Sequence, residues 1–112
     1  MKKVEAIVRH HRLEEVKEAL ALAGALGVSF TEVRGFGRQR GRTEHYRGVE
    51  YTVDLIPKIH IQLFVRDEQL SAITNAILHS ARTGDVGDGK MIISDVIDAI
   101  AIRTGERGEE VI

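Results

Sequence analysis

The chain has 112 residues, of which 43% are hydrophobic and 29% charged, and its formal net charge is -1. This length predicts a single domain, residues 1–112, that buries roughly two thirds of its unfolded surface. The near-neutral charge excludes a global basic field for nucleic acid or anionic lipid, and the absence of cysteine excludes disulfides and thiolate metal sites. No apolar run approaches the ~20 residues of a membrane span and no signal-peptide core opens the chain, so we expect a cytoplasmic protein.

The first part of the chain predicts a strand, a helix and a second strand. Residues 3–9 alternate between apolar and polar side chains, which favours a strand. Residues 12–23 carry apolar side chains at helical spacing, namely Leu13, Val16, Leu20 and Ala23. Gly24 and Gly27 end this helix, and residues 28–36 are expected to form the second strand.

The second part repeats this pattern. Residues 56–66 show the clearest alternation of side chains between the two faces of a strand. One face is formed by Ile59, Ile61, Leu63 and Val65, and the other by Lys58, His60, Gln62 and Phe64. Asp67 is the expected N-cap of a second helix, whose apolar stripe is Leu70, Ile73 and Ile77. Gly84 to Lys90 is an expected turn and residues 91–94 a last strand, whereas residues 95–103 are ambiguous.

This order predicts an α+β fold, a ferredoxin-like β-α-β-β-α-β sandwich with both helices on one face of the sheet. A long loop, at about residues 37–55, separates the second and third strands, and a polar tail occupies about residues 104–112. Long connections in small domains are usually functional or disordered. The half-apolar second face of the sheet and its unpaired edges suggest self-association.

Three glycine-rich segments are candidates for chemistry, at residues 35–39, 83–90 and 103–108. Glycine allows successive backbone N–H groups to approach an anion closely. Lysine adds a point charge and arginine a planar set of donors. Gly87 to Lys90 has the form of such an anion site, although its spacing differs from the P-loop and an ordinary tight turn is the alternative.

Together these segments carry a family resemblance. The motifs, in chain order, are residues 31–39 (TEVRGFGRQ), 46–51 (YRGVEY), 57–58 (PK), 81–84 (ARTG), 87–90 (GDGK) and 103–106 (RTGE). Along nearly its whole length the chain resembles the PII signal-transduction proteins of nitrogen regulation. The resemblance implies a homotrimer with ATP or ADP in each cleft between neighbours. It also implies a non-enzymatic regulator that senses ATP/ADP and 2-oxoglutarate and acts on nitrogen-metabolism proteins through its long loop.

The resemblance also implies roles for individual residues. The residues that match the family's nucleotide site are Ser29, Gly35, Phe36, Gly37, Arg38, Phe64, Gly87, Asp88, Gly89, Lys90 and Arg103. Those that match the 2-oxoglutarate site are Gln39, Gly41 and Lys58, and Gln39 also matches the residue that helps to hold Mg²⁺. Magnesium prefers oxygen ligands, so a glutamine carbonyl beside phosphate and keto-acid oxygens suits it.

Two loop residues match family positions that serve signalling. Tyr51 matches the tyrosine that receives a uridylyl or adenylyl group in many members, which would add bulk and negative charge. Arg47 matches the arginine that enters ammonium channels. The implied partners are therefore an ammonium channel, nucleotidyltransferases and nitrogen-assimilation enzymes, with no nucleic acid and with membranes met only through a protein.

The chain departs from the family at residues 10, 11 and 101. Ala101 replaces an arginine, and His10 and His11 replace Pro-Phe. Adjacent residues do not share a helix face, which argues against a metal site at the two histidines. The alternative functions are a metal-binding or metal-tolerance trimer of similar architecture and a phosphoryl-transfer enzyme, which the fold also hosts.

Overall fold

The computed structural model describes residues 1–36, 43–46, 49–52 and 55–112, the two short ranges by backbone alone. The predicted order of helices and strands is confirmed, and the last strand is longer than expected. The strands are β1 (Lys2–Arg9), β2 (Ser29–Gly35), β3 (Thr43–Tyr46), β4 (Val49–Thr52), β5 (Ile56–Val65) and β6 (Gly89–Asp95). The helices are α1 (Leu13–Leu22) and α2 (Leu70–Ala81), and short 3-10 turns occupy His10–Arg12, Asp67–Gln69 and Glu109–Val111.

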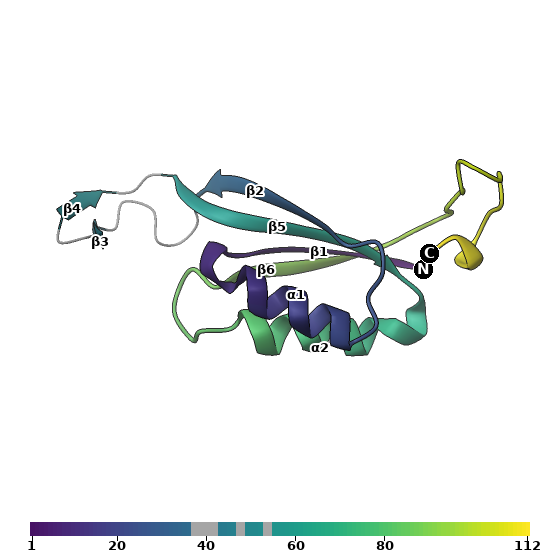
Figure 1. Cartoon of the computed structure of the whole chain (residues 1–112), viewed down its shortest axis with the longest axis horizontal. Coiled ribbons are helices and arrows are strands. Elements are labelled where there is room, and N and C mark those ends of the chain that lie inside the picture. Colours follow the sequence, from purple (N-terminus) through teal and green to yellow (C-terminus); the bar gives the residue numbers. More distant parts are fainter. Residues whose placement is uncertain (37–42, 47–48, 53–54) are drawn as a thin grey trace.

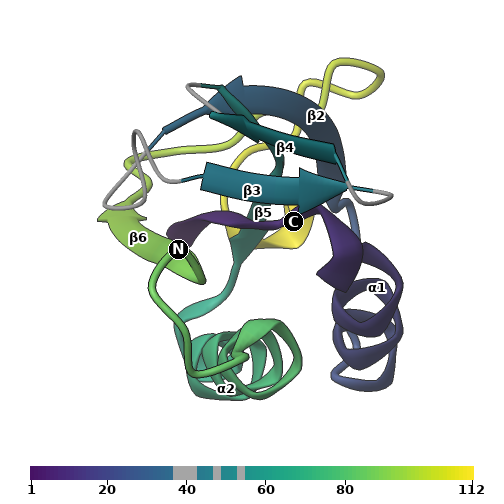
Figure 2. The same cartoon turned by 90° about the vertical axis from the view of Figure 1, so that its left-hand side faces the viewer.

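The main sheet has the strand order β2-β5-β1-β6, and every neighbouring pair is antiparallel. Both helices cover one face of this sheet, which leaves the other face without helices (Figures 1 and 2). The central pair β1 and β5 aligns Val4 with Leu63 and Ala6 with Ile61, so that the apolar sides of both strands face the helices together. This two-layer arrangement confirms the predicted ferredoxin-like fold.

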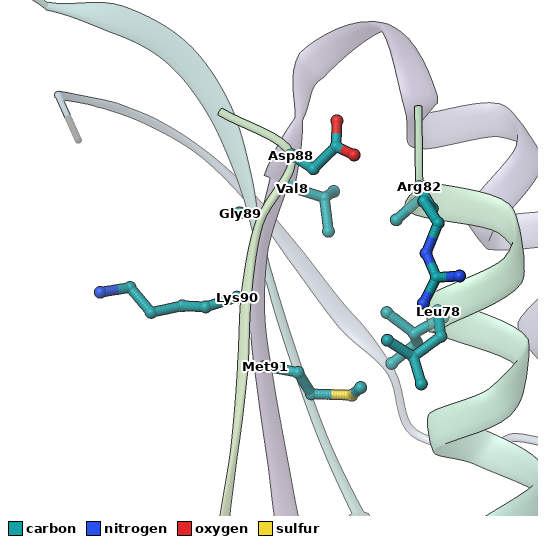
Figure 3. Close-up of a pocket in the computed structure, with 9 residues that line it drawn as sticks. Val8, Leu78, Arg82, Asp88, Gly89, Lys90 and Met91 are labelled. Atoms are coloured by element: carbon teal, nitrogen blue, oxygen red, sulfur yellow. The ribbon is translucent and has the colours of Figure 1, made fainter. Parts of the chain in front are cut away.

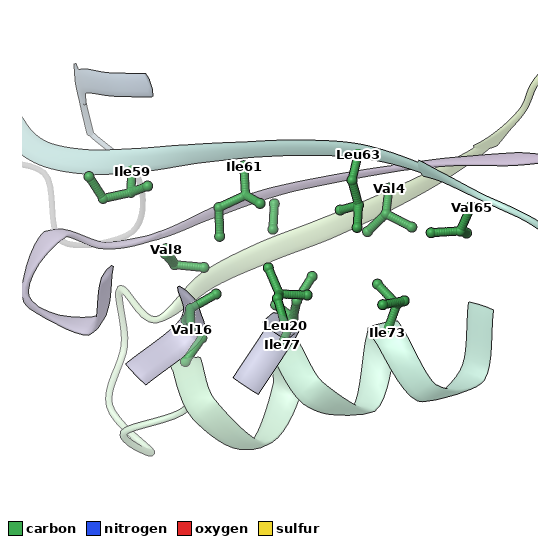
Figure 4. Packing of buried hydrophobic residues seen from close by; sticks show 12 residues of the cluster. Val4, Val8, Val16, Leu20, Ile59, Ile61, Leu63, Val65, Ile73 and Ile77 are labelled. Carbon is green, nitrogen blue, oxygen red and sulfur yellow. The ribbon is translucent and has the colours of Figure 1, made fainter. Parts of the chain in front are cut away.

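The hydrophobic core lies between the sheet and the two helices (Figure 4). The alternating residues of the two central strands form one side of the core, and the helical stripes form the other. The core residues are Val4, Ala6, Val8, Ile59, Ile61, Leu63 and Val65 from the strands, and Val16, Leu20, Ile73, Ile77 and Ala81 from the helices. The periodicity of the sequence therefore identified which faces are buried, because burial of apolar area is the main favourable term in folding.

Two details differ from the sequence prediction. Asp67 as the N-cap of α2 is wrong: a 3-10 turn precedes the helix, and the Asp67 carboxylate instead accepts a hydrogen bond of 2.9 Å from the N-terminal ammonium. The span expected as a plain loop contains the β3–β4 hairpin, which pairs Thr43 with Thr52 and Tyr46 with Val49. The ambiguous residues 95–103 form no helix, and Ile100 makes an isolated bridge to Arg107.

The chain is elongated, with extents of 54 × 24 × 20 Å and a radius of gyration of 16.4 Å. A compact domain of this length has a radius of about 13 Å. The β3–β4 hairpin extends from one end of the sheet, and the segment after β6 extends from the other (Figure 1). Ile97 and Ile102 of that segment are almost fully exposed, so the tail, which in the structure comprises residues 96–112, does not pack on the core of its own chain. No helix in the described ranges is long and apolar enough to cross a membrane.

We expect Leu20→Ala to lower the free energy of unfolding by about 2–5 kcal/mol, because Leu20 is 1% exposed and its truncation leaves a cavity in the core. Leu22 lies in the same helix and is 83% exposed, so Leu22→Ala is the matched control and should change stability by less than about 0.5 kcal/mol. Urea unfolding measures both. Equal effects of the two substitutions would contradict this assignment of the core.

Candidate functional site: a glycine turn held by two cations

The glycine-rich turn of residues 82–88 joins α2 to β6. Gly87 and Gly89 both have φ of +104°, a conformation that side chains other than glycine rarely adopt. A Cβ atom at Gly89 would lie 1.7 Å from the carbonyl oxygen of Ile7. Only glycine therefore lets the end of this turn approach β1 closely enough to begin the β1–β6 ladder.

The Asp88 carboxylate is the centre of the turn. One oxygen accepts hydrogen bonds of 2.8 Å from the backbone N–H groups of Thr83 and Gly84. The other accepts from the Thr83 hydroxyl and, at 2.9 Å, from Arg9 Nε. The carboxylate thus points into its own turn and closes residues 83–88 into a ring of local hydrogen bonds.

These contacts keep Asp88 ionised. The Thr83 hydroxyl and then the Arg9 guanidinium hold the pKa of this carboxyl far below its usual range, and the backbone N–H groups of Thr83 and Gly84 act in the same direction. Hydrogen bonds to the charged form of an acid stabilise that form. An anion-binding role for the turn is compatible with a carboxylate in it because the negative charge faces inward and is paired.

Two cations hold the turn from the end of the sheet. Arg9 Nη2 donates to the carbonyl of Val86 at 2.8 Å, and Lys58 Nζ donates to the carbonyl of Gly87 at 2.9 Å. Arg9 ends β1 and Lys58 lies near the start of β5, where the two residues are direct partners in the antiparallel register. Sequence reasoning missed Arg9, since only the pairing of β1 with β5 brings it beside Lys58.

Lys58 is unusual because it is 7% exposed. Burial lowers the pKa of its ammonium, the nearby Arg9 charge lowers it further, and Asp88 acts in the opposite direction. A buried ammonium needs compensating hydrogen bonds. In the sequence Lys58 belongs to the polar face of its strand, whereas the structure covers it with the turn.

The open face of the sheet is where this turn can present donors to an anion. The side chain of Lys90 extends on one side of β6, whereas Met91 points to the other side (Figure 3). Met91 and the mostly apolar residues around it line a cavity of about 170 Å³ between α2 and β6. Asp88, Gly89 and Lys90 also border this cavity, but the Lys90 side chain extends away from it, toward the open face of the sheet (Figure 3).

The predicted site residues divide between the two ends of the sheet. Gly35 ends β2 and Phe36 follows it, at the same end of the sheet as Lys58 and the glycine turn, because Gly35 pairs with Ile56 at the start of β5. This end therefore holds Gly87 and Asp88 of the turn and Gly89 and Lys90 of β6, together with Lys58, Gly35 and Phe36.

The other end holds the remaining described residues. Ser29 pairs with Gln62, and Phe64 pairs with Lys3. Phe64 lies six residues beyond Lys58 on the same strand, which corresponds to about 20 Å. Arg103 belongs to the tail, which leaves the sheet where the N–H of Val96 donates to the carbonyl of Met1. A single copy of the chain therefore keeps these two groups of residues apart.

Several predicted residues lie outside the described part of the chain: Gly37, Arg38, Gln39, Gly41 and Arg47. The backbone of Tyr51 lies in β4 opposite Glu44, and its side chain is outside the described residues. His10 Nε2 lies 3.2 Å from the Glu32 carboxylate. Within the described ranges, no three or more His, Asp or Glu residues form a group that could hold a metal ion.

The family model described as nitrogen regulatory protein P-II matches residues 1–106. The chain belongs to the nitrogen regulatory protein P-II family. It is 53% identical to nitrogen regulatory protein P-II of Cereibacter sphaeroides and 51% identical to that of Microchaete diplosiphon. Each comparison covers the full length of this chain and of the relative. It is 49% identical to nitrogen regulatory protein P-II 1 of Methanothermobacter thermautotrophicus, with all of this chain and 97% of the relative covered. These P-II relatives are named as regulatory proteins.

We expect the ion-paired Asp88 to make this P-II chain acid-sensitive. Because the pKa of Asp88 is lower in the folded than in the unfolded chain, its stabilising contribution is present above its ordinary pKa of 3.8 and is lost as the pH falls toward the folded value. Asp88→Asn should therefore be less stable than wild type at pH 7, and the difference should shrink below about pH 3.

Urea unfolding at a series of pH values measures this difference. Asp85→Asn is the matched control, since Asp85 lies in the same turn with an exposed side chain. A stability difference between Asp88→Asn and wild type that stays constant from pH 7 to the acid limit would contradict the assignment.

Proposed function

We propose that this P-II family chain is a homotrimeric sensor that binds ATP or ADP between neighbouring copies and reads 2-oxoglutarate beside the nucleotide. The observation that carries the proposal is the separation of the predicted nucleotide residues into two groups at opposite ends of one sheet. One nucleotide can contact both groups only if it lies between two copies of the chain. It would then contact the glycine turn of one copy and the opposite end of the sheet in the other copy. The family resemblance supplies the number of copies, three.

Exposed apolar surface supports self-association. β2 and β6 are edge strands of the main sheet, and the face without helices carries Phe64 and Ile92, both exposed. The tail adds Ile97 and Ile102. Unpaired strand edges and contiguous apolar patches mark association surfaces. Neighbouring copies would cover these surfaces and bring Ser29, Phe64 and Arg103 of one copy to the turn of the next.

The chemistry of the turn suits phosphate. Among the described residues, none accepts a hydrogen bond from the N–H of Gly87, and Lys90 makes no ion pair. A backbone donor and a nearby ammonium are the groups that bind phosphate oxygens in such turns. We assign Gly35, Phe36, Gly37 and Arg38 to the same nucleotide, where Arg38 would add charge-assisted donors.

The keto-acid site adjoins this end of the sheet. Gln39 would supply an oxygen to Mg²⁺, and Gly41 and Lys58 would bind 2-oxoglutarate. Bound Mg²⁺ supplies a bridge between phosphate and keto-acid oxygens. ADP lacks the γ-phosphate and should support this assembly poorly, so the ATP/ADP ratio and 2-oxoglutarate would together select the conformation of the long loop.

The long loop is the proposed output. A nucleotidyl group on Tyr51 would add bulk and negative charge where partners dock, and Arg47 would enter an ammonium channel. Nitrogen-assimilation enzymes and nucleotidyltransferases are the other proposed partners, and the chain itself would act as a regulator without catalysis. No observation on the described residues favours the alternative metal-binding or phosphoryl-transfer functions.

Calorimetry tests the sensor. We expect ATP and ADP to bind wild type, and 2-oxoglutarate to bind tightly only with Mg²⁺ and ATP, because the assembly needs the γ-phosphate. Gln39→Glu adds negative charge to the metal site, so it should abolish the 2-oxoglutarate response while ADP binding stays within about twofold. Equal binding of 2-oxoglutarate with and without ATP would count against the proposal.

Mixing two defective variants tests whether the site is shared. Lys90→Ala and Arg103→Ala should each weaken ADP binding about tenfold, since each removes one charge-assisted contact. Unfolding the two together and refolding them should restore some wild-type sites, because the intact turn of one copy meets the intact tail of the other. The same proteins refolded separately and then mixed are the control. Absence of any recovery after joint refolding would place the whole site within one copy.

A further inference from the structure

The turn of residues 83–88 is held by Arg9 and Lys58 through three acceptors: the carbonyl of Val86, the carbonyl of Gly87 and the carboxylate of Asp88. The two cations come from β1 and β5, strands in the centre of the sheet. We call this arrangement the clamp. It joins the central strands of the sheet to the segment that we assign to nucleotide phosphates.

The clamp and the turn depend on one another electrostatically. Arg9 and Lys58 are neighbours of like charge, and the Arg9 charge acts to lower the pKa of Lys58. Two adjacent cations, one of them buried, are tolerable only when hydrogen-bond acceptors and a countercharge compensate them. The turn supplies both, in the form of two carbonyl oxygens and the ionised Asp88.

The clamp also sets which way the turn presents its backbone. The C=O and N–H groups of one trans peptide unit point in opposite directions. Arg9 holds the carbonyl of Val86, so the N–H of Gly87, in the same peptide unit, is directed away from Arg9. Within the described part of the chain that N–H has no acceptor. An anion site needs a backbone N–H that is not used inside the protein, and the N–H of Gly87 meets this need, whereas the N–H of Asp88 donates to the carbonyl of Asp85 at 3.3 Å.

We propose that Arg9 and Lys58 are positioning residues for the phosphate-binding turn, so that Lys58 contributes to nucleotide affinity before any keto acid is bound. This inference rests on the proposed function. It gives Lys58 a second role, because its ammonium has three donors and the bond to Gly87 uses one of them. A carboxylate bound to Lys58 would therefore act directly on the turn that holds the phosphates.

The first test measures ADP affinity without Mg²⁺ and without 2-oxoglutarate. Lys58→Met and Arg9→Gln should each bind ADP about tenfold more weakly than wild type, since each releases a charge-assisted bond that shapes the turn. Arg9→Lys keeps the charge but has no planar pair of donors, so its affinity should fall between those of wild type and Arg9→Gln.

Arg12→Gln is the matched control. The Arg12 guanidinium also holds a distant backbone carbonyl, that of Ser80, at 2.8 Å from Nε and 2.6 Å from Nη2, but neither hydrogen bond reaches the turn of residues 82–88. Its ADP affinity should stay within about twofold of wild type. An equal loss in Arg12→Gln would show that any damage to the fold weakens binding, which would overturn the positioning role.

A second measurement does not depend on the nucleotide. The amide resonance of Gly87 in the free protein should shift in Arg9→Gln and in Lys58→Met, and should stay in place in Arg12→Gln. Only the first two variants lose a hydrogen bond to one of the two carbonyl groups that flank this amide, those of Val86 and Gly87. A double-mutant cycle of Arg9→Gln with Asp88→Asn should be strongly non-additive for ADP binding, since both residues act through one ion pair.

The outcomes separate the inference from the proposed function. Wild type that fails to bind ADP would remove the proposed function and this inference with it. Wild type that binds ADP while Arg9→Gln and Lys58→Met bind equally well would leave the sensor intact and overturn the clamp. An unmoved Gly87 resonance in both clamp variants would overturn it as well.

Discussion

The ion pair between Arg9 and Asp88 is the contact on which the candidate site depends. Its 2.9 Å bond fixes the turn after α2 to the end of β1, and the carboxylate then organises the N–H groups of Thr83 and Gly84 around itself. Without a countercharge at this point, the carboxylate would repel the phosphates that the turn is proposed to bind. With it, a turn that contains an acid can still offer an anion the N–H of Gly87, which is unpaired among the described residues, and the ammonium of Lys90.

The predicted site residues lie at the two ends of an elongated chain. A sheet of four strands brings Lys58 and the glycine turn together at one end and leaves Ser29 and Phe64 at the other. The hairpin and the tail extend beyond these two ends (Figure 1). In a single copy of the chain, Ile97 and Ile102 of the tail stay exposed and the predicted ligand residues stay apart. Both features are consistent with copies that complete one another, as we propose for this member of the P-II family.

The sequence predicted the fold well because the apolar periodicity is strong. Alternation in residues 56–66 and the helical stripe of Leu70, Ile73 and Ile77 both identify buried faces without knowledge of the partners. Prediction failed at Asp67, which a local capping rule assigns to the start of the helix. Its carboxylate instead accepts a hydrogen bond from the N-terminal ammonium, 66 residues away in the chain. It also failed to find Arg9, whose role arises from strand pairing and from a turn that lies more than 70 residues away.

The residue pattern by itself determined the order of strands and helices, the composition of the core and the position of the glycine-rich turn, because each of these follows from local spacing and local backbone preference. The tertiary structure decided the burial of Lys58, the inward direction of the Asp88 carboxylate and the separation of the predicted site residues between the two ends of the sheet. Those features depend on strand register and on contacts between residues that are distant in the chain. Local periodicity carries no information about such contacts, so only the folded arrangement reveals them.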